Sequence, residues 1–368
     1  MSDKPRQPLL LSVFSTFGVG GPQVRFAAIA NHFADRFRHV ILAMDGDYSC
    51  SERLKPDLNV DFWPLDHRRG QAITNRRLFR QILRATHPAC LVTYNWGTIE
   101  WAMANLPKIA RHVHVEDGFG PEEATQQLRR RVWARRILLS NSDVIVPSHQ
   151  LERLALDVWH LRPGKVHYIA NGIDCARFAH AGSEPRVQQD DLPVIGTVAA
   201  LREEKNLIRL LDAFHLVRAN HACRLVICGD GPEREKLVRH AATLGISSDV
   251  TFMGHVSDVE RVYAGLDIFA LSSDTEQMPT SVIEAMAAGL PIVSSDVGDV
   301  RTMVATQNQR FVVPTDARSL AHAFAELLTD ETLRREIGAA NQARASRDYT
   351  GDRMFAAYGA WFGADQAT

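Results

Sequence analysis

The chain has 368 residues, of which 45% are hydrophobic and 23% charged, a composition typical of a globular protein large enough for two hydrophobic cores. This composition excludes the disordered, collagen-like and fibrous classes. The 42 basic and 43 acidic residues nearly cancel, but residues 1–168 carry a net charge of +7 and the remainder −8. The two halves therefore present different charges, which suggests different partners.

Short apolar runs alternate with helical patterns through the first half of the chain. We expect strands at 9–14, 39–44, 60–63, 90–94, 111–115, 144–146 and 166–169. Between the first two, Phe26, Ile29, Ala30 and Phe33 recur with the spacing of one helix face. This alternation predicts a doubly wound parallel sheet covered by helices, an α/β domain of the Rossmann-like kind.

The alternation restarts in the second half after a polar stretch at 180–192, which reads as an interdomain connection. We expect strands at 194–198, 224–228, 250–253, 268–271, 292–294 and 310–313. The sequence thus predicts two Rossmann-like domains, at 1–170 and 171–349. It also predicts a C-terminal helix within 350–368, whose apolar part, 354–362, packs back onto the first domain.

The five cysteines form no C-x-x-C pair and no set with zinc-ligand spacing. Reduced thiols in a cytoplasmic protein are therefore expected. No apolar stretch approaches the ~20 residues that a membrane-spanning helix needs.

Unusual residues gather directly after the predicted strands. In the first half they are Gly18, Gly20 and Gly21, then Glu116 to Gly118, then Asn171 and Gly172. In the second half they are Arg202 and Lys205, then 229–234, then 274–284. Ligands of open parallel sheets bind beyond the carboxyl ends of the strands, so these clusters predict a cleft between two facing domains.

Five segments resemble one enzyme family. They are IANGID at 169–174, GTVAALREEKN at 196–206, CGDGPER at 228–234, FMGHVSDV at 252–259 and SSDTEQMPTSVIEAMAAGLPIV at 272–293. In this order the segments resemble the group 1, or family 4, retaining glycosyltransferases of GT-B fold. The Gly-Gly-x-x-x-Arg stretch from Gly20 to Arg25 extends the resemblance to the N-terminal half.

The resemblance implies a donor site around the E-x7-E pair Glu276 and Glu284. Glu276 is expected to contact the donor sugar hydroxyls and Glu284 the ribose hydroxyls. Pro279 and Gly289 suit the beginning and end of a helix between them. Backbone groups at the start of this helix are expected to bind the diphosphate, and the residues concerned are Met278, Pro279, Thr280 and Ser281.

Further donor-binding residues follow from the other segments. Lys205 and Arg202 are two cations that can neutralise a diphosphate, although many family members read Gly-Arg where this chain has Ala199 and Ala200. Backbone groups at strand ends are expected to line the nucleotide sugar, at Gly20, Gly21, Gly229, Gly231, Gly254, His255 and Val256. For Asp230, between two glycines, a plain turn residue is an equally good interpretation.

The acceptor side departs from the family pattern. Many members place a catalytic histidine before a glycine, but here Asp117 precedes Gly118. His112 and His114 come earlier in the strand and share a sheet face, where histidines are usually part of the core. Asp117, His114 and Glu116 therefore remain open as acceptor-side residues. Asp299 is a second departure, where a glycine commonly follows Gly298.

Two other features allow functional and structural interpretations. Asp45-Gly46-Asp47 resembles a metal-binding D-x-D, but turns collect such residues and the resemblance implies a metal-independent enzyme, so we predict no metal site. Five arginines with apolar neighbours at 129–138 fit a helix on an anionic membrane surface. An arginine-rich surface helix with a buried apolar stripe is the alternative.

The sequence thus predicts a retaining glycosyltransferase that needs no cofactor beyond its nucleotide-sugar substrate, with UDP or GDP as the nucleotide. The expected acceptor is a glycan or a lipid-linked precursor in bacterial cell-surface or exopolysaccharide biosynthesis. The expected location is cytoplasmic and peripheral to the inner membrane face, with no nucleic-acid partner. A sugar-nucleotide epimerase on the same scaffold and a noncatalytic nucleotide-sugar-binding protein are the alternatives.

Overall fold

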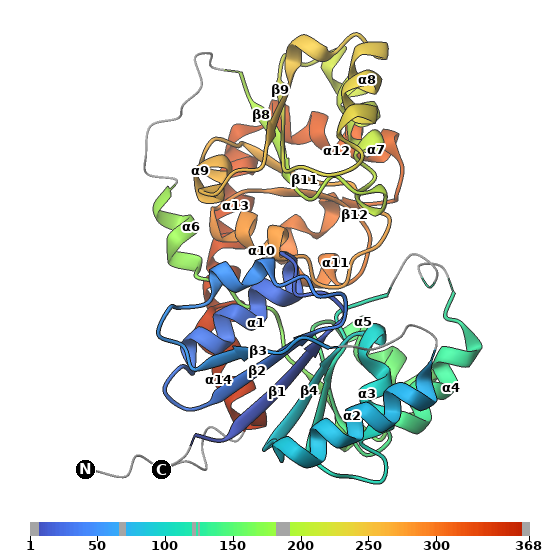
Figure 1. Ribbon diagram of the computed structural model, residues 1–368. Coiled ribbons are helices and arrows are strands. Elements are labelled where there is room, and N and C mark those ends of the chain that lie inside the picture. The colour runs from blue at the N-terminus through green and yellow to red at the C-terminus, as the bar shows by residue number, and fades with distance from the viewer. Residues whose placement is uncertain (1–6, 66–70, 120–122, 124–125, 182–191, 363–368) are drawn as a thin grey trace. The chain divides into compact units, whose positions relative to one another are not determined.

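The computed structural model of the chain describes residues 7–65, 71–119, 123, 126–181 and 192–362. The chain forms two compact units (Figure 1). Unit 1 comprises Met1–Ala170 and Met354–Thr368, and unit 2 comprises Asn171–Arg353. The division after residue 170 coincides with the expected domain boundary.

Within the described part of unit 1, seven strands form a parallel sheet in the order β3-β2-β1-β4-β5-β6-β7. The strands are β1 (Leu9–Phe14), β2 (Arg38–Ala43), β3 (Val60–Phe62), β4 (Cys90–Tyr94), β5 (His112–Val115), β6 (Asp143–Val146) and β7 (Val166–Tyr168). In the register of the central pairs, Leu11 lies opposite Val40 of β2 and Leu91 of β4. The strand order reverses between β1 and β4, so their carboxyl ends mark the place where ligands of such sheets bind.

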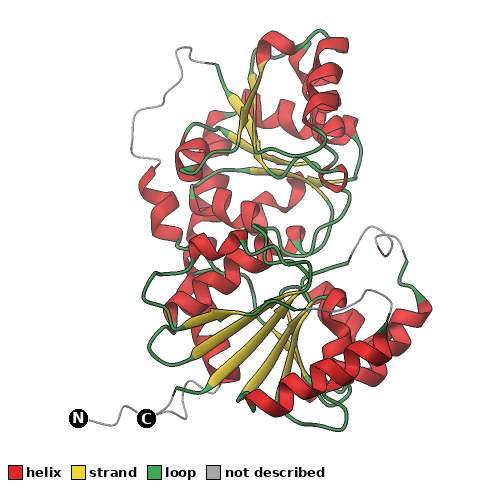
Figure 2. Ribbon diagram, viewed as in Figure 1, coloured by secondary structure: helices red, strands yellow, loops and turns green. Residues whose placement is uncertain are grey.

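Helices cover both faces of this sheet (Figure 2). They are α1 (Gly21–His32), α2 (Ala72–Thr86), α3 (Ile99–Ala104), α4 (Arg129–Leu138), α5 (His149–Arg153) and α14 (Gly351–Phe362). Side chains alternate along β1, so Leu10 and Phe14 pack in one cluster with α1 and α14, while Leu11 packs in another with α2 and α3. From Met354 onward α14 belongs to unit 1, where its apolar pattern places it. Residues 363–368 lie outside the described residues.

Unit 2 repeats the architecture with six described parallel strands in the order β10-β9-β8-β11-β12-β13. The strands are β8 (Val194–Val198), β9 (Arg224–Cys228), β10 (Val250–Gly254), β11 (Ile268–Leu271), β12 (Ile292–Ser295) and β13 (Val312–Val313). The helices are α6 (Cys175–Ala181), α7 (Leu207–Arg218), α8 (Arg234–Thr243), α9 (Val259–Ala264), α10 (Thr280–Ala287), α11 (Val300–Met303), α12 (Ala317–Thr329) and α13 (Glu331–Asp348). The order reverses between β8 and β11, which again marks a ligand-binding edge.

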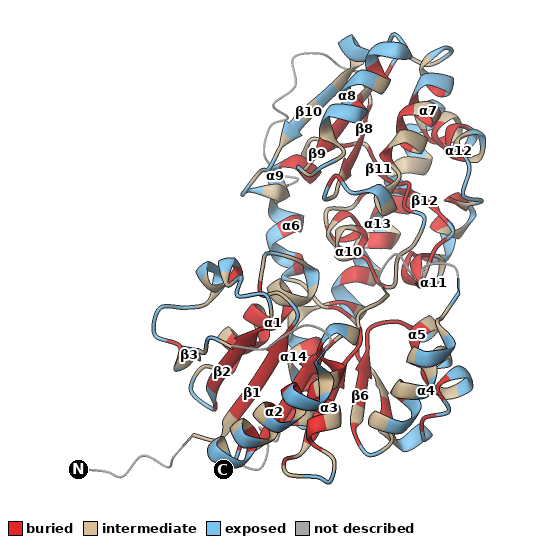
Figure 3. Ribbon diagram, turned by 45° about the vertical axis from the view of Figure 1, so that its right-hand side comes forward, coloured by how far each residue is buried: buried red, intermediate tan, exposed pale blue. Residues whose placement is uncertain are grey.

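The core of unit 2 explains the helical stripe predicted after Asn206. Leu207, Leu210, Leu211 and Phe214 of α7 pack with β8, β9 and α12 in one buried cluster. Apart from the edge strand β10, the strands are largely buried (Figure 3), as expected for a parallel sheet covered on both faces. Long apolar runs in the sequence therefore identified them.

Two expectations about unit 2 are wrong. The strand expected at 310–313 is only Val312–Val313, because Arg310 and Phe311 end a 3-10 turn that begins at Thr306. The polar stretch at 180–192 does not connect the domains, because α6 before it and β8 after it both belong to unit 2. Residues 182–191 of that stretch lie outside the described residues.

None of the described helices combines the length and the apolar character that crossing a bilayer requires.

Candidate active site

The loop between β11 and α10, together with α10 itself, carries the two glutamates of the E-x7-E pattern. Pro279 caps α10 with an extended backbone, and proline suits this place because its missing N–H would have no helical acceptor. The helix gives way to Gly289 at a φ of +78°, a conformation that favours glycine. Glu276 consequently lies in the loop and Glu284 in the second turn of the helix, as the sequence predicts.

Glu276 is held by two side chains. Lys205 Nζ lies 2.6 Å from Glu276 Oε1, and Ser273 Oγ donates to the same oxygen at 2.7 Å. Lys205 follows β8 and Glu276 follows β11, the two strands between which the sheet order reverses. The Lys205 and Glu276 side chains are 24% and 10% exposed, so their attraction is less screened than that of a surface ion pair.

The backbone that carries Glu276 is braced from two sides. Asp299 N–H donates to the carbonyl of Gln277 at 3.0 Å, and Asn171 Nδ2–H donates to the carbonyl of Met278 at 2.8 Å. Gly298 has a φ of +56°, and a Cβ there would lie 2.4 Å from the carbonyl oxygen of Glu276. The loop is therefore preformed. Asp299 supports the loop through its backbone N–H, so this hydrogen bond does not depend on the side chain, although a glycine is common at that position in the family.

Glu284 points one carboxylate oxygen at a buried tyrosine. Tyr263 Oη donates to Glu284 Oε2 at 2.7 Å. Burial raises the pKa of Glu284, and the Tyr263 hydrogen bond and the nearby Arg177 oppose this rise. With Oε2 occupied, Oε1 is the oxygen that suits a ligand hydroxyl.

The first turn of α10 offers backbone N–H groups close to these glutamates. Such groups lack intrahelical acceptors and favour anions. Met278 and Pro279 are buried, whereas Thr280 and Ser281 are half-buried. This arrangement can hold a phosphate without a further charged side chain.

The glycine turn after β9 packs against the loop that leads to Lys205. A Cβ on Gly229 would lie 1.9 Å from the carbonyl oxygen of Ala199, and one on Gly231 would lie 2.5 Å from that of Leu201. Gly229 N–H also donates to the carbonyl of Gly254 at 2.8 Å. The glycines thus allow three loops to meet at one edge of the sheet. Asp230 Oδ1 accepts Gly231 N–H at 2.7 Å, which is turn chemistry.

Beyond that turn, His255 is exposed and Val256 half-buried in the loop after β10. Their places at the same sheet edge are compatible with contacts to a nucleobase.

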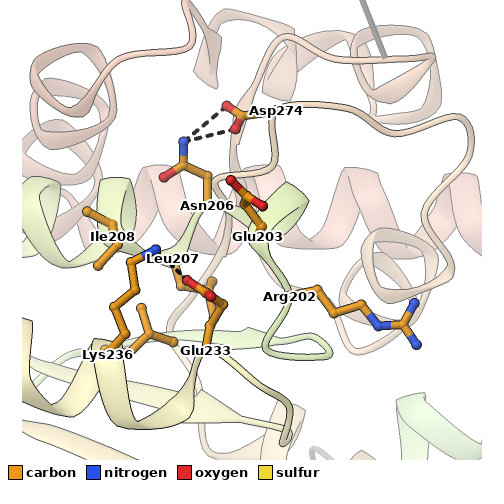
Figure 4. A pocket seen from close by; sticks show the side chains of 9 residues that line it. Arg202, Glu203, Asn206, Leu207, Ile208, Glu233, Lys236 and Asp274 are labelled. Atoms are coloured by element: carbon orange, nitrogen blue, oxygen red, sulfur yellow. Dashed lines mark hydrogen bonds and ion pairs between the residues drawn. The ribbon is translucent and has the colours of Figure 1, made fainter. Parts of the chain in front are cut away.

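Arg202 is not joined to this group. Its side chain is exposed, and in Figure 4 its guanidinium extends away from the other labelled side chains. It borders a pocket of about 290 Å³ between the starts of α7 and α8, in which Asn206 Nδ2 donates to Asp274. Neither Glu276 nor Glu284 lines this pocket. Lys205 is thus the cation that the structure places at Glu276.

In unit 1, Asp117 forms a bidentate ion pair with Arg25 of α1. The two oxygen–nitrogen distances are 2.6 and 2.8 Å, and the side chains are 7% and 10% exposed for Arg25 and Asp117. Asn95, which follows β4, accepts Asp117 N–H at 2.6 Å through Oδ1. Gly20 and Gly21 open the helix that carries Arg25. These residues lie at the edge of the sheet where the order reverses between β1 and β4.

Asn95 has a φ of 57° and a ψ of 176°, a region that costs a residue other than glycine about 1–3 kcal/mol. Strain of this size persists where surrounding contacts hold it, and it is frequent at functional sites. No pattern in the sequence points to this residue.

The strand histidines belong to the core. Thr93 Oγ1 lies 2.8 Å from both His112 Nε2 and His114 Nδ1, so the two rings share a sheet face as predicted. His114 is 0% exposed, which does not fit the expectation that it meets an acceptor. Burial, with a contribution from His114, lowers the pKa of His112 to about 3. Glu116 is also fully buried, which leaves Asp117 as the most accessible of the open acceptor-side residues.

The arginine-rich helix α4 is divided between core and surface. Arg135 is fully buried, where it pairs with Glu116 and Glu123, and Arg131 pairs with Glu123 as well. The expectation of five surface arginines is therefore wrong. The exposed side chains lie on one helix face and are Arg129, Arg130, Trp133, Arg136 and Ile137. Trp133 and Ile137 are 56% and 59% exposed, whereas Val132 and Leu138 pack against the core, so only part of the expected apolar stripe is buried.

Asp45 and Asp47 accept backbone N–H groups of their own turn, from Asp47 and Ser49. No group of three or more histidine, cysteine, aspartate or glutamate side chains suited to a metal ion occurs in the part of the chain that the structure describes. The five cysteines are buried and form no disulfide.

The sequence analysis assigned no holding role to the residues that contact the functional side chains. Tyr263, Ser273, Asn171 and Arg25 each contact a predicted site residue or its loop. Ser273 and Asn171 fall inside the family-like segments, so their positions there were a signal. Arg25 ends the Gly-Gly-x-x-x-Arg stretch, but its contact with Asp117 in unit 1, like the contact of Tyr263 with Glu284 in unit 2, is not revealed by any spacing in the sequence.

Comparison with known proteins assigns the family. One family model, described as Glycosyltransferase Family 4, matches residues 19–177, and another, described as Glycosyl transferases group 1, matches residues 183–344. The chain belongs to the group 1, family 4 glycosyltransferases. The chain has the GT-B fold, with one α/β parallel-sheet unit for each family model.

The curated relatives resemble part of the length of this chain. It is 30% identical over 204 residues to the putative glycosyltransferase EpsF of Bacillus subtilis (strain 168), which is 53% of this chain and 52% of that relative. It is 31% identical over 148 residues to the lipopolysaccharide core biosynthesis glycosyltransferase LpsE of Rhizobium meliloti (strain 1021), which is 40% of this chain and 43% of that relative. The chain thus spans about half the length of the curated relatives it matches.

A solved structure resembles the chain over nearly its full length. The crystal structure of Anabaena Alr3699/HepE in complex with UDP-glucose has a TM-score of 0.82 and 19% identity, and the match covers 97% of this chain and 100% of that one. At this identity the similarity concerns the fold.

Proposed function

We propose that this protein transfers a sugar from a nucleoside-diphosphate sugar to a glycan or lipid-linked acceptor, with retention of anomeric configuration. The observation that carries the proposal is the pairing of Lys205 with Glu276 beside the start of α10. This pairing joins a cation suited to a diphosphate, a carboxylate suited to sugar hydroxyls and a helix N-terminus suited to phosphate oxygens.

On the donor side, Glu276 would accept hydroxyls of the sugar and Glu284 those of the ribose. Lys205 and the N–H groups of Thr280 and Ser281 would bind the diphosphate, with Arg202 as a second cation on the same loop. Gly229, Gly231 and Gly254, with His255 and Val256, would surround the nucleotide through backbone groups. UDP and GDP are the nucleotides we expect.

The chemistry follows from where charge develops. As the bond between sugar and diphosphate breaks, Lys205 and the helix dipole would stabilise the leaving group, so no metal ion is required. Attack from the face that the diphosphate leaves would retain the configuration, and the departing phosphate would help to take the acceptor proton. Asp117, held by Arg25 and Asn95, is the residue we propose for contact with the acceptor.

The acceptor class is proposed from relatives and charge. LpsE is named for lipopolysaccharide core biosynthesis, which supports a role in bacterial cell-surface or exopolysaccharide assembly. The exposed face of α4 carries Arg129, Arg130 and Arg136 around Trp133 and Ile137, with the Arg136 guanidinium 5.2 Å from the centre of the Trp133 ring. Basic and apolar side chains on one helix face suit an anionic lipid surface. We therefore propose peripheral association with the inner face of a membrane.

Vesicle co-sedimentation tests this association. Near an anionic bilayer each basic residue contributes about 1 kcal/mol, so Arg129, Arg130 and Arg136 together are enough for salt-sensitive binding. Changing the three to glutamate should abolish binding to anionic vesicles at low salt, whereas Arg239→Glu and Arg335→Glu, at 71% and 80% exposed positions of unit 2, should not. Equal binding to neutral and anionic vesicles would favour a soluble acceptor.

The transfer reaction is tested with isotope-labelled UDP- and GDP-sugars, incubated with and without acceptor extract. A glycosyltransferase moves label into a larger product only when acceptor is present. An epimerase converts the donor without acceptor, and a noncatalytic binding protein leaves it unchanged. A panel of nucleotides in thermal denaturation identifies the base, since a ligand at a hundred times its dissociation constant stabilises by about 2.7 kcal/mol.

Two variants locate the donor site. Glu284→Ala and Lys205→Ala should reduce donor binding or turnover far more than they reduce the free energy of unfolding, because both residues are assigned to the ligand. Wild-type kinetics in both variants would mean that the site is wrongly placed.

A further inference from the structure

Tyr263 is a buried side chain next to the proposed donor site, held by contacts on several sides. It lies on α9, is 0% exposed, and its ring contacts Phe178 of α6 and Phe269 of β11 with centroid distances of 5.6 and 5.7 Å. Aromatic contacts on two sides fix the ring and hence the direction of its hydroxyl. The hydroxyl can therefore hold a neighbouring group in one orientation.

The hydroxyl meets Glu284 at 2.7 Å and the carbonyl oxygen of Ser281 at 3.3 Å, both on α10. A hydroxyl has one proton, and the shorter contact to the charged oxygen is the stronger hydrogen bond. Burial and the neighbouring Glu284 raise the pKa of Tyr263 well above its ordinary value, so the hydroxyl stays protonated and remains a donor.

The other charged groups around Glu284 do not replace this contact. Arg177 on α6 faces both Glu284 and Glu260 on α9, and it forms an ion pair with Glu260. Asp174, just before α6, also acts on Arg177. The charge of Arg177 is therefore shared among three carboxylates, while Tyr263 gives Glu284 a directed hydrogen bond.

We propose that Tyr263 is a positioning residue for ribose recognition: it occupies Glu284 Oε2 and thereby orients Oε1 toward the hydroxyls of the nucleotide. This inference rests on the proposed function, in which Glu284 accepts those hydroxyls. It adds a residue that never touches the donor but sets the geometry of the one that does. Without the hydroxyl, the half-buried carboxylate would rotate and bind a proton more readily.

The test uses the full chain and calorimetric titration with UDP and GDP and with their 2′,3′-dideoxy forms. In Tyr263→Phe the ring packing stays while the hydroxyl is lost. We expect about tenfold weaker binding of the nucleotide that the wild type accepts, the size of a lost hydrogen bond to a charged group. We also expect most of the preference over the dideoxy form to disappear.

The pH profile separates positioning from mere packing. The Tyr263 hydrogen bond lowers the pKa of Glu284, so its loss should move the acid limb of nucleotide binding to higher pH. Tyr349→Phe is the matched control, since Tyr349 is a buried tyrosine of the same unit whose hydroxyl donates to the carbonyl of Met303. This control should keep the wild-type limb and the wild-type preference.

A double variant shows whether Tyr263 acts through Glu284. In a Glu284→Gln background, Tyr263→Phe should change affinity less than twofold, because the carboxylate it orients is gone. If Tyr263→Phe does not fold, 3-fluorotyrosine at this position is the second measurement. Its more acidic hydroxyl is a better donor and should move the acid limb to lower pH.

The outcomes are distinct. Wild-type protein that binds nucleotide, with a Tyr263→Phe variant of unchanged affinity, preference and pH limb, overturns the inference and leaves the proposed function standing. Wild-type protein that binds neither UDP nor GDP overturns both.

Discussion

Substitution of Gly298 by alanine should uncouple the donor site from its support. Two costs arise from the structure. The φ of +56° at this residue costs any L-residue other than glycine about 1–2 kcal/mol. In addition, the new Cβ would lie 2.4 Å from the carbonyl oxygen of Glu276 and 2.7 Å from that of Gln277.

The second cost falls on the site itself. Real Cβ contacts stay above about 3.0 Å, so the backbone of Glu276 must move by roughly 0.6 Å. Misplacement by ~1 Å in an active site costs about a hundredfold in rate. We therefore expect about tenfold weaker donor binding or turnover in Gly298→Ala, together with a loss of about 1–2 kcal/mol in the free energy of unfolding.

Gly289→Ala is the control that separates these costs. Gly289 also has a positive φ, +78°, but a Cβ there would meet only the Gln342 side chain, at 3.5 Å. It should lose similar stability and keep wild-type donor binding. Calorimetric titration of the donor and denaturant unfolding measure the two quantities. Equal donor affinities in the two variants would refute the argument that Gly298 supports Glu276.

Three further predictions concern pH, strain and metals. Burial lowers the pKa of His39 from 6.5 to about 4, so the stability that its neutral form contributes is present above pH 6.5 and is lost as pH falls toward 4. In His39→Leu, the loss in free energy of unfolding between pH 6.5 and pH 4 should be smaller than in the wild type by about 3 kcal/mol. Parallel curves of stability against pH for variant and wild type would contradict this prediction. Asn95→Gly should raise the free energy of unfolding by about 1 kcal/mol, because it relieves backbone strain, and it should lower turnover. His87→Gly, which also replaces a residue at positive φ, should change stability but not turnover. Unchanged turnover in Asn95→Gly would mean that Asn95 has no part on the acceptor side. Activity should survive chelation, and loss restored by magnesium or manganese would show that a metal takes part.

The strands and the positions of Glu276 and Glu284 relative to α10 were predictable because each depends on local sequence. A strand buried on both faces reads as an apolar run, so β4 and β11 are evident without any tertiary information. Likewise Pro279 and Gly289 mark the ends of α10, which fixes Glu276 outside the helix and Glu284 inside it.

The supports of the site were not predictable, because they join distant elements. Arg25 and Asp117 are 92 residues apart, and their pairing depends on how α1 is rotated on the sheet. Nothing in the sequence distinguishes one arginine of α4 from another, yet Arg135 is buried between Glu116 and Glu123. Periodicity alone cannot identify such a residue, because charge is normally a sign of exposure.

Under the proposed function, the departures from the family pattern would give the ion pair between Lys205 and Glu276 a larger part in donor recognition. Ala200 stands where many members have arginine, and Arg202 is exposed, so Lys205 is the cation already in place beside Glu276. Ordering a lysine side chain costs up to about 2 kcal/mol of conformational entropy. Glu276, which the buried Ser273 holds, already orders Lys205 in the protein without donor, so donor binding does not have to supply this free energy. Because the same contact also fixes the Glu276 carboxylate, under the proposed function one ion pair would couple recognition of the diphosphate to recognition of the sugar. A nucleotide without its sugar would contact Lys205 through its diphosphate but leave Glu276 without the sugar hydroxyls.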